Sequence, residues 1–116
     1  YKDRRPPHSE AAEQAVLGAI LIDDEALLRA SESIDDTMFW RESHRRIYRA
    51  MIALSESRAG IDTVTLADEL ERRGEMDAAG GREYLALLAD AVPTSANVSY
   101  HAQIVREKAL LRRLIE

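Results

Sequence analysis

The sequence predicts an all-α protein, a compact bundle of about six helices. Three observations carry this prediction. Apolar residues recur three or four positions apart along most of the chain, which is the helical period. Almost no segment alternates apolar and polar residues for long enough to form a strand. Ser, Asp, Gly and Pro stand where the periodic runs begin and end, as they do at helix boundaries.

The first helix is expected directly after the Pro6-Pro7 breaker. Ser9 is its expected N-cap, because a serine hydroxyl accepts a hydrogen bond from an early backbone N–H. Its apolar side chains form two adjacent rows one turn apart: Val16 with Ile20, and Leu17 with Leu21. Asp23 and Asp24 end this helix and are expected to cap a short second one through Ala26, Leu27 and Leu28.

The third helix is predicted from spacings of four, three, four and three residues. The residues on this stripe are Trp40, His44, Ile47, Met51 and Leu54, and the helix is expected to end near Gly60. His44 is expected to be half-buried on the stripe. Three arginines fall outside it: Arg41, Arg45 and Arg49.

Two shorter helices are expected next. Thr65 to Asp68 matches a capping box in form, with Leu66 and Leu70 on the buried side and Gly74 as the stop. The Gly80-Gly81 pair is a second breaker. The helix behind it contains Tyr84, Leu85, Leu87 and Leu88, and Pro93 closes it.

The last helix is long, and Thr94 or Ser95 is its expected cap. Its run is still helical in pattern at Glu116, which indicates a module of a longer protein. Its apolar residues cover more than the roughly 100° stripe of an ordinary surface helix. A partner therefore covers part of it, or the helix packs on the core along its whole length. The candidate interface residues are Tyr100, Ile104, Leu111, Leu114 and Ile115.

Composition fits one soluble domain. The chain has 116 residues, 46% of them hydrophobic, and no cysteine, which excludes a disulfide framework. The apolar run at residues 15–22 is far shorter than the ~20 residues that span a bilayer. No signal peptide is visible at the N-terminus. These features predict a cytoplasmic protein without a membrane partner, whose residues 1–8 form a flexible tail and residues 9–93 a globular body.

The formal net charge of −5 is unevenly distributed. Residues 1–8 and residues 101–116 each carry +2, so by subtraction residues 9–100 carry −9. Affinity for nucleic acid comes mostly from Lys and Arg that displace counterions from phosphates. An acidic body is therefore a poor partner for DNA, and direct binding would have to use the two ends.

A search for chemistry in the sequence finds no catalytic, cofactor-binding or metal-binding residue. The phosphate-binding pattern G-x-x-x-x-G-K-[ST] is missing, and so is the His spacing of a zinc site. The acidic pairs at 23–24 and 35–36 are explained as helix caps. No serine stands in a recognisable arrangement with a base. This chain is therefore not expected to be an enzyme by itself.

Basic clusters at residues 45–49, 72–73 and 112–113 have acidic neighbours, which favours solvated, self-paired helix surfaces. Residues 64–88 resemble a helix-turn-helix in outline, two helices joined by a turn that contains glycine. A nucleic-acid-binding regulator is thus the alternative function. Its second helix carries Arg82 as the only base, beside Glu83, which makes a poor reader of the major groove.

Several separated motifs in a fixed order carry a family resemblance. These are residues 12–18 (AEQAVLG), 39–41 (FWR) with His44, 62–66 (DTVTL), 70–74 (LERRG), 80–85 with Gly80-Gly81 and Tyr84-Leu85, 93–97 (PTSAN) and 104–108 (IVREK). Together they resemble the N-terminal domain of bacterial DnaB-type replicative DNA helicases. The resemblance covers nearly the whole chain from Pro6 onward. Glu42 departs from it, because relatives often have proline there.

The resemblance implies a collar domain within a two-tiered hexameric ring. Residues 94–116 would be the first arm of a helical hairpin that pairs two such domains. The implied partners are a second copy of the domain, primase, a helicase loader and, through the full ring, single-stranded DNA at the replication fork. ATP and Mg²⁺ would belong to a separate motor domain, where the parent protein hydrolyses ATP and unwinds duplex DNA.

Overall fold

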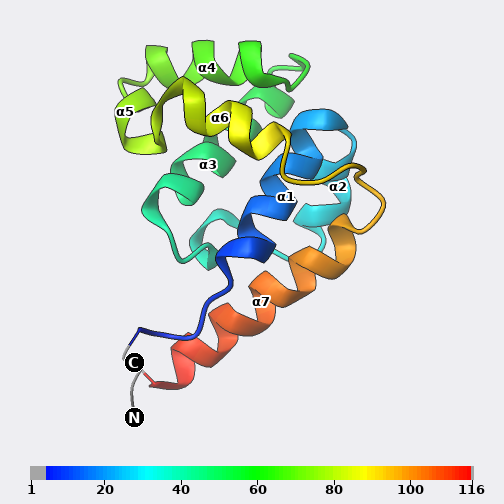
Figure 1. Ribbon diagram of the computed structural model, residues 1–116, viewed down its shortest axis with the longest axis vertical. Coiled ribbons are helices and arrows are strands. Elements are labelled where there is room, and N and C mark those ends of the chain that lie inside the picture. The colour runs from blue at the N-terminus through cyan, green and yellow to red at the C-terminus, as the bar shows by residue number, and fades with distance from the viewer. Residues whose placement is uncertain (1–4, 116) are drawn as a thin grey trace.

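The chain folds into helices alone within residues 5–115, which are those that the computed structural model describes (Figure 1). This part spans 43 × 29 × 24 Å. It contains seven α-helices and one 3-10 helix in the order α1 (Glu10–Ile22), α2 (Ala26–Ser31), η1 (Asp36–Met38), α3 (Glu42–Glu56), α4 (Thr63–Arg72), α5 (Met76–Ala79), α6 (Gly81–Ala89) and α7 (Val98–Ile115). The predicted all-α class and long last helix are confirmed. The one-turn α5 is the helix that the sequence pattern did not separate.

Helix α1 is the central element of the bundle, because α2, α3, α6 and α7 all pack against it. The predicted cap is confirmed: the backbone N–H of Ala12 donates to Ser9 Oγ at 3.1 Å. Gly18 lets α6 approach closely, since a Cβ at this position would stand 2.3 Å from the carbonyl oxygen of Leu88. The core on both sides of α1 is built from Leu17, Ile20, Phe39, Ile47 and Met51.

The start of α3 corrects the predicted stripe. Trp40 precedes the helix and is half-exposed, and the fully buried aromatic residue is its neighbour Phe39. The backbone is extended at Phe39 and Arg41, so consecutive side chains here point to opposite sides and helical spacing does not apply. Arg45 lies outside the stripe, and its guanidinium donates to the carbonyls of Phe39 and Trp40 at 2.7 and 2.8 Å.

Helix α4 begins earlier than predicted. Its N-cap is Asp62, which accepts a hydrogen bond from the backbone N–H of Thr65 at 2.9 Å. Thr65 Oγ1 in turn accepts from the backbone N–H of Asp62 at 3.0 Å. Thr65 is therefore the third helical residue of the capping box and not its first member. The predicted glycine breakers are confirmed, with φ of +68° at Gly74 and +108° at Gly80.

The connection from α6 to α7 is fastened at the corner between α1 and α2. Ser95 Oγ donates to Asp23 Oδ2 at 2.8 Å, and Arg29 donates to both side chains at 3.3 and 3.4 Å. Helix α7 begins only at Val98. The prediction that Thr94 or Ser95 caps it is therefore wrong, because the Ser95 side chain binds Asp23 and that of Thr94 accepts from Ala96 within the preceding turn.

Candidate interaction surface

The inner face of α7 is made of small and medium apolar side chains. Val98, Ala102, Val105 and Ala109 are buried and recur at spacings of four, three and four residues. Two alanines on this face let the α7 backbone lie close to α1, against which it packs together with α2 and η1. This narrow stripe is what the globular body covers.

The opposite side of α7 exposes the predicted interface residues. The exposed fractions are 74% for Tyr100, 37% for Ile104, 45% for Leu111, 80% for Leu114 and 66% for Ile115. At 3.6 residues per turn these five side chains fall within an arc of about 100°, which we call the outer arc. The outer arc points away from the globular body, which covers only the inner face of α7. The structure thus places the five residues on one exposed, mainly apolar face of α7, with Glu107 as a charged residue within the same arc.

The C-terminal half of α7 is held by arginine. Arg106 donates to the carbonyl of Ser33 at 3.0 Å. Arg112 donates to the carbonyl of Met38 at 2.6 Å and to that of Pro7 at 2.8 Å, a contact between the two ends of the described chain. These hydrogen bonds fix the rotation of α7 about its axis. They therefore keep the outer arc turned outward.

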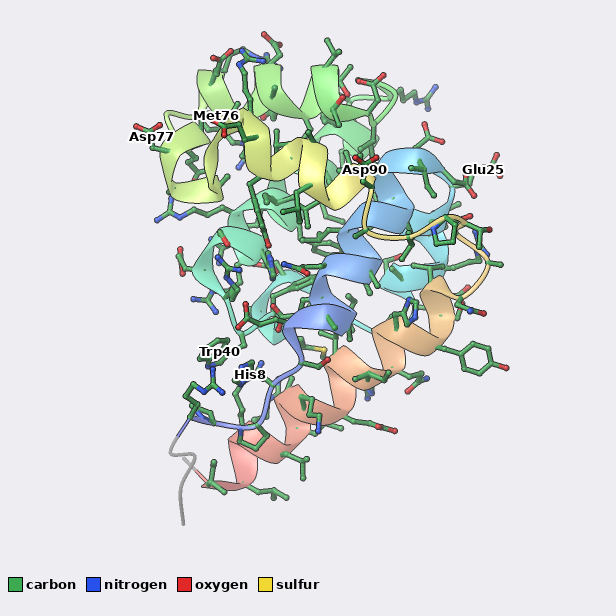
Figure 2. The ribbon with its side chains drawn as sticks, viewed as in Figure 1. His8, Glu25, Trp40, Met76, Asp77 and Asp90 are labelled. Carbon is green, nitrogen blue, oxygen red and sulfur yellow. The ribbon has the colours of Figure 1, made fainter. Side chains whose placement is uncertain are left out.

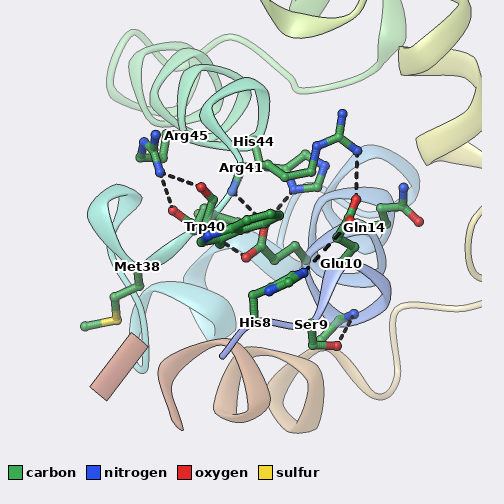
Figure 3. Close-up of polar contacts among 12 residues, drawn as sticks. His8, Ser9, Glu10, Gln14, Met38, Trp40, Arg41, His44 and Arg45 are labelled. Carbon is green, nitrogen blue, oxygen red and sulfur yellow. Dashed lines mark hydrogen bonds and ion pairs between the residues drawn. The ribbon is translucent and has the colours of Figure 1, made fainter. Parts of the chain in front are cut away.

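The segment just before α1 packs on the body. Residues 1–4 of the predicted flexible tail lie outside the described residues. The His8 ring stacks on that of Trp40 with centroids 3.7 Å apart and planes 18° apart, as Figures 2 and 3 show. His8 Nδ1 lies 2.7 Å from the carbonyl oxygen of Pro6. The half-exposed Trp40 is thereby covered by the chain end that Arg112 also holds.

Beneath this segment, α1, α3 and α6 share a buried polar cluster, which we define as Glu13, His44 and Tyr84. Glu13 is 2% exposed and His44 is completely buried, so the prediction of a half-buried His44 is wrong. Glu13 Oε1 lies 2.7 Å from His44 Nδ1, and His44 Nε2 lies 2.6 Å from Tyr84 Oη. One imidazole therefore connects three helices.

The hydrogen-bond directions in the buried polar cluster are consistent with one another. Glu13 Oε2 also accepts from the backbone N–H of Trp40 at 2.7 Å. Tyr84 Oη accepts from Gln14 at 3.1 Å and from Arg41 at 3.4 Å, so its own O–H is left to donate to His44 Nε2. His44 then carries its proton on Nδ1 and donates it to Glu13. Because every member has partners, the cluster fixes how the three helices meet.

Sequence reasoning placed His44 on a buried stripe but missed Glu13 and Tyr84 as its partners. A signal for Glu13 was present, because this residue shares a helical face with Val16, Leu17 and Ile20. An acidic residue in register with such a stripe needs a partner inside the protein. The identity of that partner was not readable, because His44 is 31 positions away along the chain.

Paired surface charges account for the basic clusters of the α3, α4 and α6 region. The pairs are Arg45 with Glu42, Arg46 with Glu42 and Glu75, Arg49 with Asp36, Arg72 with Asp68 and Glu69, Arg73 with Glu69, and Arg82 with Glu71. A hydrogen bond from Arg45 lowers the pKa of Glu42, and one from Arg73 lowers that of Glu69. Arg82 lies 2.7 Å from Glu71, so the one base in the second helix of the helix-turn-helix alternative has an internal partner.

Two searches of the described residues complete the inventory. Within residues 5–115, no group of three or more His, Cys, Asp or Glu side chains is arranged to hold a metal ion. Over the same range, no helix has both the length and the apolarity needed to cross a membrane.

Known proteins resemble this chain along nearly its whole length. Residues 5–107 match the family model of the DnaB-like helicase N terminal domain. The chain is 47% identical over 115 residues to the replicative DNA helicase DnaB of Geobacillus stearothermophilus. This match covers 99% of the chain and 25% of that protein. It is 47% identical over 113 residues to the replicative DNA helicase DnaC of Bacillus subtilis, a match that covers 97% of the chain and 25% of that protein. The chain thus spans about a quarter of the length of these relatives.

Solved structures agree with the sequence relatives. The crystal structure of the N-terminal domain of DnaB helicase from Mycobacterium tuberculosis superposes with a TM-score of 0.94 at 44% identity, covering 96% of this chain and 77% of that one. A structure of a DnaB-like replicative helicase, described with its interactions with primase, gives a TM-score of 0.79 at 30% identity, covering 92% and 25%. The helices described above therefore have the same arrangement in solved proteins.

Proposed function

Because the chain belongs to the family of DnaB-like helicase N-terminal domains, we propose that it is the collar domain of a replicative DNA helicase. In this role it pairs with a second copy of itself within a hexameric ring and offers a docking surface to primase and to a helicase loader. ATP hydrolysis with Mg²⁺ and the unwinding of duplex DNA belong to the remainder of the parent protein, at the replication fork in the cytoplasm. Single-stranded DNA meets this domain only through the complete ring.

The outer arc of α7 is the observation that carries this proposal. Burial of a Leu or Ile side chain stabilises a protein by roughly 1.5–3 kcal/mol, so Leu111, Leu114 and Ile115 in water represent a large unused stabilisation. A second copy of the same arc would cover them in a symmetric contact. Residues 94–116 then form the first arm of a helical hairpin at this pairing surface.

Analytical ultracentrifugation tests the pairing. We expect the wild-type chain to self-associate as its concentration rises, and Leu111→Asp and Ile115→Asp to shift it to monomer, because a charge in the arc cannot be desolvated without cost. Leu87→Asp is the matched control, since Leu87 is a 51% exposed leucine on α6, outside the arc. A wild type that stays monomeric at the highest concentration reached would contradict the pairing surface.

Docking of primase is supported by the solved relative whose description includes its interactions with primase. The relative covers 92% of this chain at 30% identity, so a primase contact on the same fold is the expectation for this protein. Binding of primase to the complete parent protein, measured by isothermal titration calorimetry, tests this part of the proposal. Primase that gives no heat of binding would contradict it.

A further inference from the structure

A groove lies where the start of α2 meets the connection between α3 and α4. Its residues are Asp24, Glu25, Leu27, Leu28, Ser55, Arg58, Ala59, Gly60 and Ile61, and we call it the α2 groove. It holds about 260 Å³, which is below the range of pockets for cofactor-sized ligands. This volume fits one apolar side chain of a protein partner. In Figure 2, Glu25 marks the groove at the edge of the molecule remote from His8 and Trp40.

The groove combines an apolar wall with an acidic rim. Leu28 is 70% exposed, while Leu27 and Ile61 below it are buried members of the core. Asp24 and Glu25 are exposed and have no ion pair among residues 5–115. The Asp24 carboxylate lies beside the α3–α4 connection, since a Cβ at Gly60 would stand 3.8 Å from Asp24 Oδ2. An apolar anchor next to a basic residue is the complementary partner chemistry.

The opposite wall carries Arg58 in a strained conformation. Arg58 has φ of +62°, which makes it the only residue other than glycine with positive φ within the described range. It sits just past the end of α3, where its N–H donates to the carbonyl of Ser55 at 3.0 Å and that of Ala59 donates to Leu54 at 2.9 Å. This hydrogen-bond pair is the Schellman motif, which ordinarily places glycine at this position.

The end of α4 provides an internal comparison. There Gly74 donates to the carbonyl of Glu71 at 3.0 Å and Glu75 donates to that of Leu70 at 2.8 Å, the same motif with glycine at the left-handed position. The chain therefore uses glycine at one Schellman turn and arginine at the other. A residue that has a Cβ is destabilising in the left-handed conformation. Arg58 is exposed and has no hydrogen bond or ion pair from its side chain within residues 5–115, so no contact inside the domain offsets this cost.

We propose that the α2 groove receives a segment of primase, with an apolar anchor against Leu28, a basic residue facing Asp24 and Glu25, and a carboxylate paired with Arg58. This inference rests on the proposed docking of primase and names its place on the chain. The groove is remote from the C-terminal part of the pairing surface, because the α3–α4 connection lies at the end of the long axis opposite the last turns of α7 (Figure 1).

Calorimetric titration of primase into the complete parent protein tests the groove. We expect Leu28→Asp to weaken binding at least tenfold, which is the loss that one unburied leucine produces. Arg58→Gly is expected to weaken binding several-fold, whereas Arg58→Lys retains part of it because it keeps the charge. Leu87→Asp is the control, an exposed leucine on α6 that leaves affinity within twofold of wild type.

Thermal unfolding of the same variants separates a binding role of Arg58 from a structural one. Arg58→Gly relieves the left-handed strain, so we expect its Tm to rise by about 4 °C while its affinity for primase falls. A lower Tm for Arg58→Gly would overturn the argument, because Arg58 would then stabilise the fold.

The outcomes distinguish the groove from the docking proposal. Wild-type protein that does not bind primase overturns the docking of primase, and the groove assignment with it. Wild-type binding that Leu28→Asp and Arg58→Gly leave unchanged overturns the groove alone. Loss of loader binding in these variants, with primase binding intact, would also overturn it, because the occupant would then be a different protein.

Discussion

The buried polar cluster places a carboxylate inside the protein, whereas the outer arc of α7 places leucine and isoleucine in water. Both regions reverse the usual distribution of polar and apolar side chains. Glu13 is 2% exposed and finds its partners within the chain, while Leu114 is 80% exposed and finds none on the body. The difference separates two roles. A buried polar side chain that finds its partners within the chain serves the fold, whereas an exposed apolar side chain that the chain does not cover serves assembly.

The strongest test of the interior half of this comparison is Glu13→Ala. The substitution leaves His44 and the backbone N–H of Trp40 buried without their acceptor. We expect a loss of about 2–5 kcal/mol in the free energy of unfolding, the cost of leaving two buried donors without an acceptor. Urea denaturation followed by circular dichroism measures it. Glu10→Ala is the control, because Glu10 makes a partly exposed ion pair with Arg41 at 3.1 Å and its loss costs little.

Tyr84→Phe probes the third member of the buried polar cluster. It removes the hydroxyl that lies 2.6 Å from His44 Nε2 and leaves that nitrogen without a partner inside the protein. We expect a destabilisation of about 1–3 kcal/mol, the usual cost of one orphaned buried polar group. The same denaturation experiment measures it. A change below 0.5 kcal/mol would show that water replaces the hydroxyl and that the cluster does not fix the three helices.

Tyr48→Phe is the matched substitution at a hydroxyl without a partner. Tyr48 is buried, and its hydroxyl has no hydrogen bond among the described residues. Removal of that group is expected to change stability by less than about 1 kcal/mol at neutral pH. A loss as large as that of Tyr84→Phe would contradict the distinction between the two hydroxyls.

The wild type and Tyr48→Phe are expected to differ more in stability at high pH. Burial, with added repulsion from Asp35 and Asp36, raises the pKa of Tyr48 to about 12. The protonated form is therefore favoured in the folded state, and its contribution is complete below the ordinary pKa of about 10. That contribution is lost as pH rises from about 10 to 12. Unfolding curves between pH 8 and 12 should show a steeper loss of stability in the wild type than in Tyr48→Phe.

Leu114→Ser tests the exterior half and has the smallest expected effect on stability. The side chain is 80% exposed, so we expect the free energy of unfolding of the monomer to change by no more than about 0.5 kcal/mol. Self-association of the chain should nevertheless weaken. A large destabilisation of the dilute protein would mean that Leu114 belongs to the fold, and the two regions would no longer contrast.

Helical periodicity predicted the elements because each depends on residues three or four positions apart. It failed where the backbone is extended, as at Trp40, and where two residues competed for a cap, as Asp62 and Thr65 did. The exposed residues of α7 were predictable, since an arc wider than one covered stripe is visible in the sequence. The partners of His44 were not, because Glu13 and Tyr84 are 31 and 40 positions away and only tertiary packing brings them together.

The stack of His8 on Trp40 gives the protein an optical reporter of its own. The sequence has a single tryptophan, so its fluorescence comes from one known place. The segment that covers this indole also gives its Pro7 carbonyl to Arg112 of α7. Any partner that lifts the last turn of α7 would loosen that segment and change the emission of Trp40. Displacement of this turn is therefore measurable by an intrinsic spectroscopic signal, with no label attached to the chain.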